Sequence, residues 1–167
     1  MTANEWAPNP PQFQLSRWLF LRLVGFTYLL AFASLAPQIL GLVGAKGLLP
    51  IEELLDRAAE FFGVGAYYEL PTLAWISSTD GALLAYCWVG IITAGFAIVG
   101  LAPIGTFALL WVLYLSLTVA GQTFLSFQWD VLLLEVGLLA CFYAPFGLRP
   151  SLARGTNPPV AIRWLLW

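Results

Sequence analysis

Two long apolar runs of this sequence meet in the stretch Gly121-Gln122-Thr123-Phe124-Leu125-Ser126-Phe127-Gln128-Trp129-Asp130-Val131-Leu132-Leu133-Leu134-Glu135. Amides, aromatic rings and the Asp130 carboxylate lie at the junction, and the Glu135 carboxylate follows about a turn and a half later. A carboxylate is costly inside a lipid bilayer, so Glu135 is a candidate functional residue if the two runs cross a membrane.

The composition indicates a membrane protein. Of the 167 residues, 60% are hydrophobic and 10% are charged, whereas an average soluble domain is about half apolar and about a quarter charged. The excess lies in long runs, as a membrane-spanning chain requires. A net charge of -2 offers no basic surface for nucleic acid. We therefore expect an integral membrane protein that contacts the lipid bilayer and binds no nucleic acid.

The residue types also limit the chemistry. The sequence contains no histidine, which removes histidine acid–base catalysis, Ser–His and Cys–His nucleophilic pairs, and imidazole metal ligands. Cys87 and Cys141 both lie inside apolar runs and indicate buried structural thiols. The sequence predicts no metal site, no cofactor and no catalytic residue.

Four apolar runs are interpreted as transmembrane helices, at about 18–43, 82–101, 104–124 and 130–143. Pro37 should kink or end the first helix, and Ser78-Thr79-Asp80 is a typical start signal for the second. The fourth run is short for the ~20 residues that a spanning helix needs, unless 127–129 also lie at membrane depth.

The predicted fold is all-α: a four-span antiparallel bundle at 18–147, after a cytoplasmic segment at 1–17 and before a basic cytoplasmic tail at 148–167. The connector 44–80 should be extracytoplasmic and should contain an amphipathic helix that begins at Pro50. This helix can pack against the bundle ends or lie on the membrane surface. Because its polar face is not basic, we favour packing.

The basic residues predict the orientation of the bundle. They gather near its two chain ends: Arg17, Arg22, Arg149, Arg154 and Arg163. The connector instead holds more acids than bases, and the turn between the second and third spans is uncharged. Since basic residues favour the cytoplasmic side, we expect the N-terminus and the tail in the cytoplasm and the connector outside.

The candidate functional residues are Arg22, Gln128, Trp129, Asp130 and Glu135. Asp130 is interpreted as the N-cap of the fourth span. Glu135 can tilt toward the headgroups or pair with Arg22 inside the bundle, and we expect it to face the bundle interior. Gln128 and Trp129 offer an amphipathic contact surface for a partner, in a turn expected to fold near the connector helix.

The stretch 122–137 resembles the signature of the lipase maturation factor family, through its aromatic–Gln–Trp–Asp–x–Leu–Leu–Leu–Glu core. Arg17-Trp18-Leu19-Phe20-Leu21-Arg22 also fits the opening of that family. Arg163-Trp164-Leu165-Leu166-Trp167 is similar to the start of the family's next transmembrane helix. The resemblance implies that this chain is the N-terminal transmembrane part of a longer multispanning protein, without the family's large C-terminal domain.

The same resemblance implies a non-enzymatic membrane scaffold for folding or maturation, with a secreted lipase as the possible client. The animal members reside in the endoplasmic reticulum membrane; a bacterial source would place the chain in the inner (plasma) membrane. The alternative is a membrane enzyme domain related to the transmembrane part of vitamin-K-dependent carboxylases. That chemistry needs a base held in the bundle, and with no histidine and with Lys46 as the only lysine, candidates are few. The residues predict no particular oligomeric state.

Overall fold

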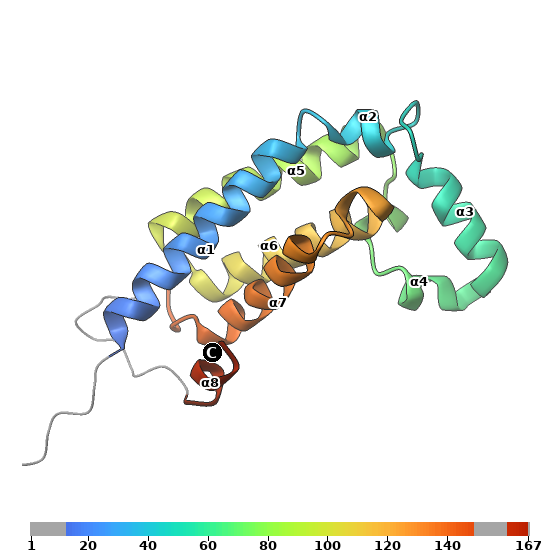
Figure 1. The fold of residues 1–167 in the computed structure, drawn as a ribbon. Coiled ribbons are helices and arrows are strands. Elements are labelled where there is room, and N and C mark those ends of the chain that lie inside the picture. Colours follow the sequence, from blue (N-terminus) through green and yellow to red (C-terminus); the bar gives the residue numbers. More distant parts are fainter. Residues whose placement is uncertain (1–12, 149–159, 167) are drawn as a thin grey trace, which may run out of the picture.

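A computed structural model describes residues 13–148 and 160–166, and every regular element within these ranges is helical. The elements, coloured along the chain in Figure 1, are α1 (Gln14–Leu35), α2 (Ile39–Val43), α3 (Ile51–Phe62), η1 (Gly63–Gly65), α4 (Ala66–Glu69), η2 (Leu73–Trp75), α5 (Asp80–Val99), α6 (Pro103–Ala120), η3 (Gln122–Leu125), α7 (Gln128–Tyr143) and α8 (Val160–Leu166).

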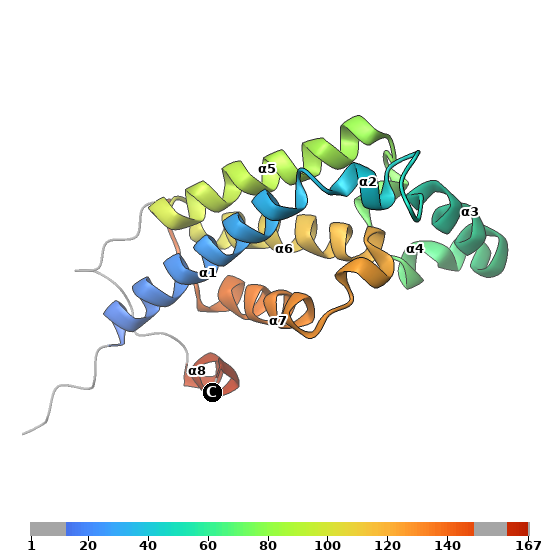
Figure 2. The same cartoon turned by 45° about the horizontal axis from the view of Figure 1, so that its top comes forward.

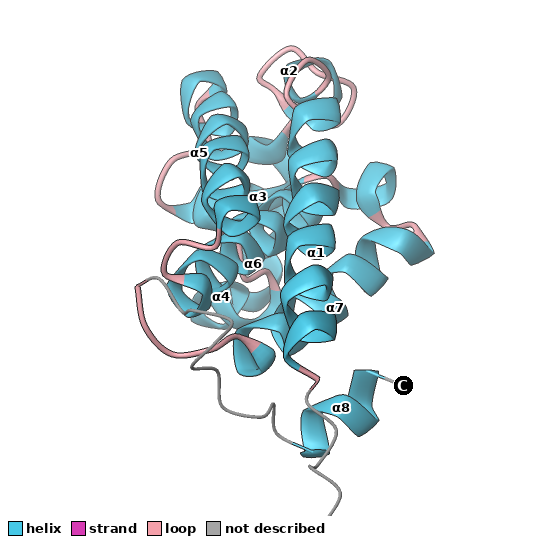
Figure 3. Ribbon diagram, turned by 90° about the vertical axis from the view of Figure 1, so that its left-hand side faces the viewer, coloured by secondary structure: helices cyan, strands magenta, loops and turns pink. Residues whose placement is uncertain are grey.

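Helices α1, α5, α6 and α7 pack side by side in an up-and-down bundle (Figures 1 and 3). Each contacts the next in this order, and α1 also reaches α6 and α7, which closes the bundle. Aromatic rings fill its centre: Tyr114 meets both Tyr28 and Phe32 edge to face, with 5.6 Å between the ring centroids in each pair. Such edge-to-face pairs stabilise a core beyond the area that they bury.

Local sequence signals explain where the helices begin and end. Pro37 separates α1 from α2, as predicted, because its ring cannot continue the helical hydrogen-bond pattern. Thr79 is the N-cap of α5, and its Oγ1 accepts a hydrogen bond from the Ala82 amide at 3.3 Å. Gly100 ends α5 with a φ of 85°, a left-handed conformation that glycine adopts without strain.

Three helices, α1, α5 and α6, are long and apolar enough to cross a membrane. The integral membrane class is therefore confirmed, and the described residues are all-α as expected. The fourth predicted span forms α7, which is 16 residues long. A helix of that length measures about 24 Å, less than the ~30 Å of a hydrocarbon core. The fourth span thus stays a prediction, although α7 is a full member of the bundle.

The connector between α2 and α5, residues 44–79, forms a cap over one end of the bundle (Figure 2). The predicted amphipathic helix is present as α3. Its first turns pack inward, since Ile51, Leu55 and Ala58 are all buried. Hydrogen bonds tie the cap region to the bundle: for example, Asp80 Oδ1 accepts from the Ala45 amide at 2.9 Å, and Gln122 Nε2 donates to the Leu49 carbonyl at 3.2 Å.

At the opposite end of the bundle, α8 packs against α7. The resemblance implied the start of a further transmembrane helix here; α8 is seven residues long, and a further span stays a prediction. The tail arginines Arg149 and Arg154 lie outside the described residues, and the side chain of Arg163 does too. At the other chain end, α1 begins at Gln14, four residues before the predicted start at Trp18.

Candidate functional site

Asp130 and Tyr114 form a buried polar pair between α6 and α7. The Tyr114 hydroxyl donates to Asp130 Oδ1 at 2.6 Å, and only 4% of the Asp130 surface is exposed. The interpretation of Asp130 as an N-cap is wrong, because α7 begins at Gln128 and the N-cap position belongs to Phe127. Asp130 therefore lies in the first turn, where the helix dipole stabilises its carboxylate and Tyr114 provides a donor.

The second carboxylate oxygen, Asp130 Oδ2, is enclosed and has no hydrogen-bond partner among the described residues. A buried oxygen without a partner costs free energy. The short bond on Oδ1 is typical of a charge-assisted hydrogen bond, which is stronger than a neutral one. The pair therefore fixes the register of α7 against α6, at the cost of one unsatisfied oxygen.

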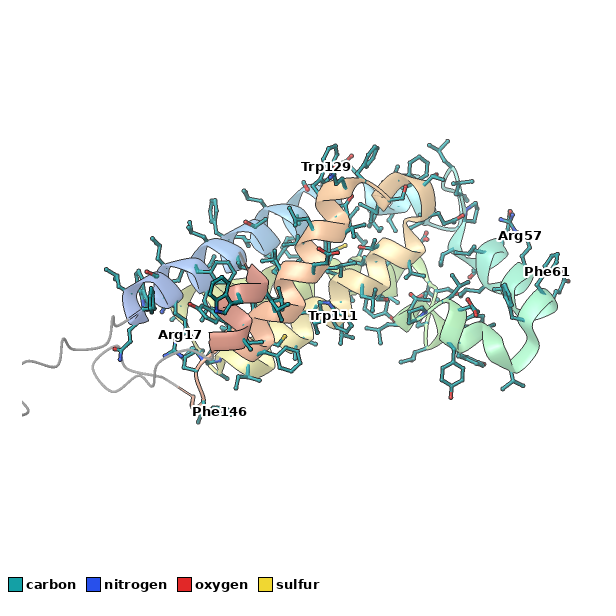
Figure 4. The ribbon with its side chains drawn as sticks, turned by 60° about the horizontal axis from the view of Figure 1, so that its bottom comes forward. Arg17, Arg57, Phe61, Trp111, Trp129 and Phe146 are labelled. Carbon is teal, nitrogen blue, oxygen red and sulfur yellow. The ribbon has the colours of Figure 1, made fainter. Side chains whose placement is uncertain are left out.

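Side-chain donors from α1 and α6 reach α7 at three successive levels. They are Tyr114 to Asp130, Tyr28 Oη to the Leu133 carbonyl at 3.1 Å, and Trp111 Nε1 to the Leu134 carbonyl at 3.0 Å, with Trp111 labelled in Figure 4. A Cβ added to Gly137 would overlap the Tyr28 hydroxyl. Sequence reasoning did not predict the contact of Tyr28 with Gly137 and Leu133, although a glycine in the quoted signature is the signal that a neighbour approaches closely.

Arg22 lies at the end of the bundle opposite the cap. Its Nη2 donates to the Val99 carbonyl at 3.0 Å, and its Cζ lies 4.4 Å from the Trp18 ring centroid. Of the two alternatives considered for Glu135, the pairing with Arg22 is therefore not supported, because Arg22 binds the end of α5. The last carbonyls of α5 carry a partial negative charge that attracts the guanidinium, and the Trp18 ring adds a cation–π contact.

Glu135 is exposed on α7, so the expectation that it faces the bundle interior is also wrong. The interior face of α7 is occupied by Asp130, Leu133, Gly137 and Ala140, all buried. Because successive helical residues are about 100° apart, a residue two positions from both Leu133 and Gly137 points to the opposite side. The sequence alone could not show this, since both faces of α7 are apolar apart from their acids.

Gln128 and Trp129 are exposed, as a contact surface requires, with Trp129 66% exposed and stacked on Phe127 at a centroid distance of 4.9 Å. They do not form a joint surface with α3, contrary to expectation. In Figure 4, Trp129 lies over the start of α7, well apart from Phe61 of the cap. The cap instead contacts η3, the segment before α7, through the hydrogen bond between Gln122 and Leu49.

The cap also carries an exposed apolar surface, which we call the cap patch. Its members extend from the end of α3 to the residue after η2: Phe61, Phe62, Val64, Tyr67, Tyr68 and Ile76. Exposure is highest at Phe61 (86%), Val64 (84%), Tyr68 (88%) and Ile76 (81%). The predicted packing of α3 is thus correct for its first half only, because α3 extends past the bundle before Gly63 ends it.

A pocket of about 450 Å³ adjoins the cap patch, between η2 and α6. Tyr67 and Trp75 line it with rings 4.8 Å apart. Ser116 of α6 holds the two sides of the pocket together. The Ser116 Oγ accepts a hydrogen bond from the Leu73 amide at 2.8 Å and shares a second one with Thr72 Oγ1 at 3.0 Å. Among the described residues, no group of three or more His, Cys, Asp or Glu side chains could hold a metal ion.

Comparison with known proteins agrees with the sequence resemblance. Residues 15–167 match the family model described as the lipase maturation factor transmembrane domain. Lipase maturation factor 1 of Bos taurus is 35% identical over 160 residues, covering 91% of this chain and 28% of the relative. Lipase maturation factor 2 is 40% identical over 157 residues in Homo sapiens (87% of this chain, 21% of the relative) and 38% over 167 residues in Gallus gallus (90% and 23%).

The chain therefore spans between 21% and 28% of the length of these relatives. No solved structure matches it.

Proposed function

Because this chain belongs to the lipase maturation factor family, we propose that it forms the membrane-embedded part of a maturation scaffold that holds an incompletely folded secreted lipase at its cap. The scaffold acts by binding rather than by catalysis. The names of the relatives support a lipase as the client, and the exposed apolar residues of the cap support the position of the binding surface.

The cap patch is the observation that carries this proposal. Its aromatic and aliphatic side chains stand exposed at the end of the bundle. Large contiguous apolar patches on an exposed surface are typical of interaction sites. An incompletely folded client exposes apolar side chains of its own, and mutual burial contributes about 25 cal/mol per Å² of apolar surface. The adjoining pocket offers room for one or two such side chains.

The proposed orientation places the cap outside the cytoplasm, where a secreted client folds. Arg17 and Arg22 lie at the end of the bundle opposite the cap, which supports a cytoplasmic position for that end. In this arrangement α7 is the fourth span, and Phe127 and Trp129 lie at the outer membrane interface, a depth that amphipathic rings favour. The membrane is that of the endoplasmic reticulum in an animal cell or the inner membrane in a bacterium.

A carboxylase-like enzyme finds less support in the bundle. Among the described residues, Asp130 is the buried carboxylate, and a catalytic base must reach its substrate. Its Oδ1 is engaged by Tyr114 and its Oδ2 is enclosed. Asp130 is therefore better suited to fixing helix register than to proton abstraction.

The test is client binding by the reconstituted chain. Proteoliposomes containing the chain, with the cap outward, are mixed with a denatured secreted lipase under refolding conditions, and lipase aggregation is followed by light scattering. The parent chain should suppress aggregation, and a Phe61→Ser, Tyr68→Ser double variant should not. Phe146→Ser is the matched control, because Phe146 is 91% exposed but lies at the other end of the bundle (Figure 4). Equal suppression by the parent and the double variant would contradict the proposal.

A further inference from the structure

The outward face of α7 differs from the outward faces of the other bundle helices. Helices α1, α5, α6 and α7 are fully described, and Glu135 is their one exposed charged side chain. The outward side of α1 carries exposed apolar side chains at helical spacing, Leu19, Leu23, Phe26 and Leu30. In the proposed function α7 is the fourth span, and the inference rests on that arrangement: an apolar outward face suits contact with lipid tails, but a carboxylate in the middle of such a face is costly.

The side chains around Glu135 repeat with a seven-residue period. Gln128, Glu135 and Phe142 are exposed at heptad spacing, and Val131 and Leu138 follow three residues after the first two. This spacing is that of the a and d positions of a coiled coil, which pack against the partner helix. Polar residues at a positions of such a seam fix the register and choice of partner. We call these five residues the α7 stripe.

We propose that the α7 stripe docks a further transmembrane helix, one that presents an arginine, a lysine or another strong hydrogen-bond donor to Glu135. The donor compensates the carboxylate, and the apolar members of the stripe pack around it. Interhelical hydrogen bonds within membranes contribute to such association, because the alternative is a polar group in contact with lipid. The described basic side chains of the bundle are committed elsewhere: Arg17 is buried and Arg22 binds the end of α5.

A second copy of this chain fits the stripe poorly. Copies inserted with the same orientation are related by a two-fold axis along the membrane normal, which places each stripe residue opposite its own equivalent. Glu135 would then face Glu135, and two like carboxylates repel each other. The occupant is therefore a helix of different sequence, with a donor where this chain has an acceptor.

A defined peptide can test the inference. The chain is reconstituted in zwitterionic lipid vesicles with a poly-leucine transmembrane peptide that carries one central arginine, or with the same peptide carrying leucine there. Association is measured by energy transfer between fluorophores on the Leu148 end of the chain and on the peptide. We expect the arginine peptide to bind about tenfold more tightly than the leucine peptide, the size of effect that interhelical hydrogen bonds produce in model peptides.

Three variants make the result specific. Glu135→Leu should remove the preference for the arginine peptide, and Glu135→Gln should keep part of it because the amide oxygen still accepts. A Glu135→Leu, Phe26→Glu double variant moves the carboxylate to the apolar face of α1 and should not restore the preference. Restoration there, or equal binding of both peptides by the parent, would overturn the proposal. So would energy transfer between labelled copies of the chain that Glu135→Leu abolishes, since the stripe would then serve self-association.

Discussion

Gly137→Ala should destabilise the bundle through a single neighbour, the Tyr28 side chain. A Cβ at position 137 would overlap the Tyr28 hydroxyl and would lie 2.9 Å from the ring carbon Cζ. Tyr28 has no exposed surface and donates to the Leu133 carbonyl, so its ring has no free space to enter. Gly137 therefore permits the close contact of Tyr28 of α1 with α7.

The expected magnitude follows from three contributions. Overpacking of a buried site costs about 1–3 kcal/mol, and loss of the Tyr28–Leu133 hydrogen bond costs about 1 kcal/mol more. The better helix propensity of alanine offsets about 1 kcal/mol. We therefore expect the free energy of unfolding to fall by about 1–3 kcal/mol. Gly95→Ala in α5 is the control, because an added Cβ there meets no atom within 4 Å and should leave stability unchanged or higher.

The assay is reversible unfolding of the detergent-solubilised chain, followed by circular dichroism, with a double-mutant cycle. Tyr28→Phe alone should cost about 1 kcal/mol, the net contribution of one hydrogen bond. Combined with Gly137→Ala, it should cost less than the sum of the two single changes, because the clashing hydroxyl is gone. Additive costs, or a Gly137→Ala chain as stable as the parent, would refute the close packing of α1 on α7.

Three further predictions concern other contacts of the bundle. Tyr114→Phe leaves buried Asp130 without its donor and should lower the free energy of unfolding by about 1–3 kcal/mol in the same assay; no change would mean that the carboxylate finds another partner. Arg22→Leu removes the cation at the end of α5 and should cost about 0.3–1 kcal/mol, reduced by high salt. In sealed right-side-out vesicles, after Cys87 and Cys141 are replaced by alanine, an impermeant maleimide should label Tyr68→Cys and not Leu148→Cys; the reverse labelling would invert the proposed orientation.

Local signals in the sequence were sufficient for some helix boundaries. A proline at position 37 and a Ser/Thr/Asp start before α5 act through their own local chemistry, so their effect does not depend on distant residues. The cap helix α3 was also predictable, because its apolar residues repeat at helical spacing. Helix ends without such a signal were predicted less well: α1 begins four residues before its predicted start, and α6 ends at Ala120, four residues before the predicted end at 124.

The positions of the two acids were not predictable in the same way. Both faces of α7 are apolar, so hydrophobicity does not decide which face turns inward. That choice depends on tertiary contacts, above all on Tyr28, whose hydroxyl fits against Gly137, and on Tyr114, which reaches Asp130 from 16 residues away. Once these contacts bury Asp130, helical geometry places Glu135 on the outward side.

The most direct test of the scaffold is site-specific photo-crosslinking from the cap to a maturing client. A photoreactive phenylalanine analogue replaces Tyr68 of the cap patch, or Phe146 at the opposite end, while a secreted lipase is synthesised in the same membrane system. The proposed function predicts a crosslink to the lipase from position 68, which weakens as the lipase acquires activity, and none from position 146. A lipase crosslink from position 146 alone, or none from either position while maturation proceeds, would contradict the assignment of the cap as the client-binding surface.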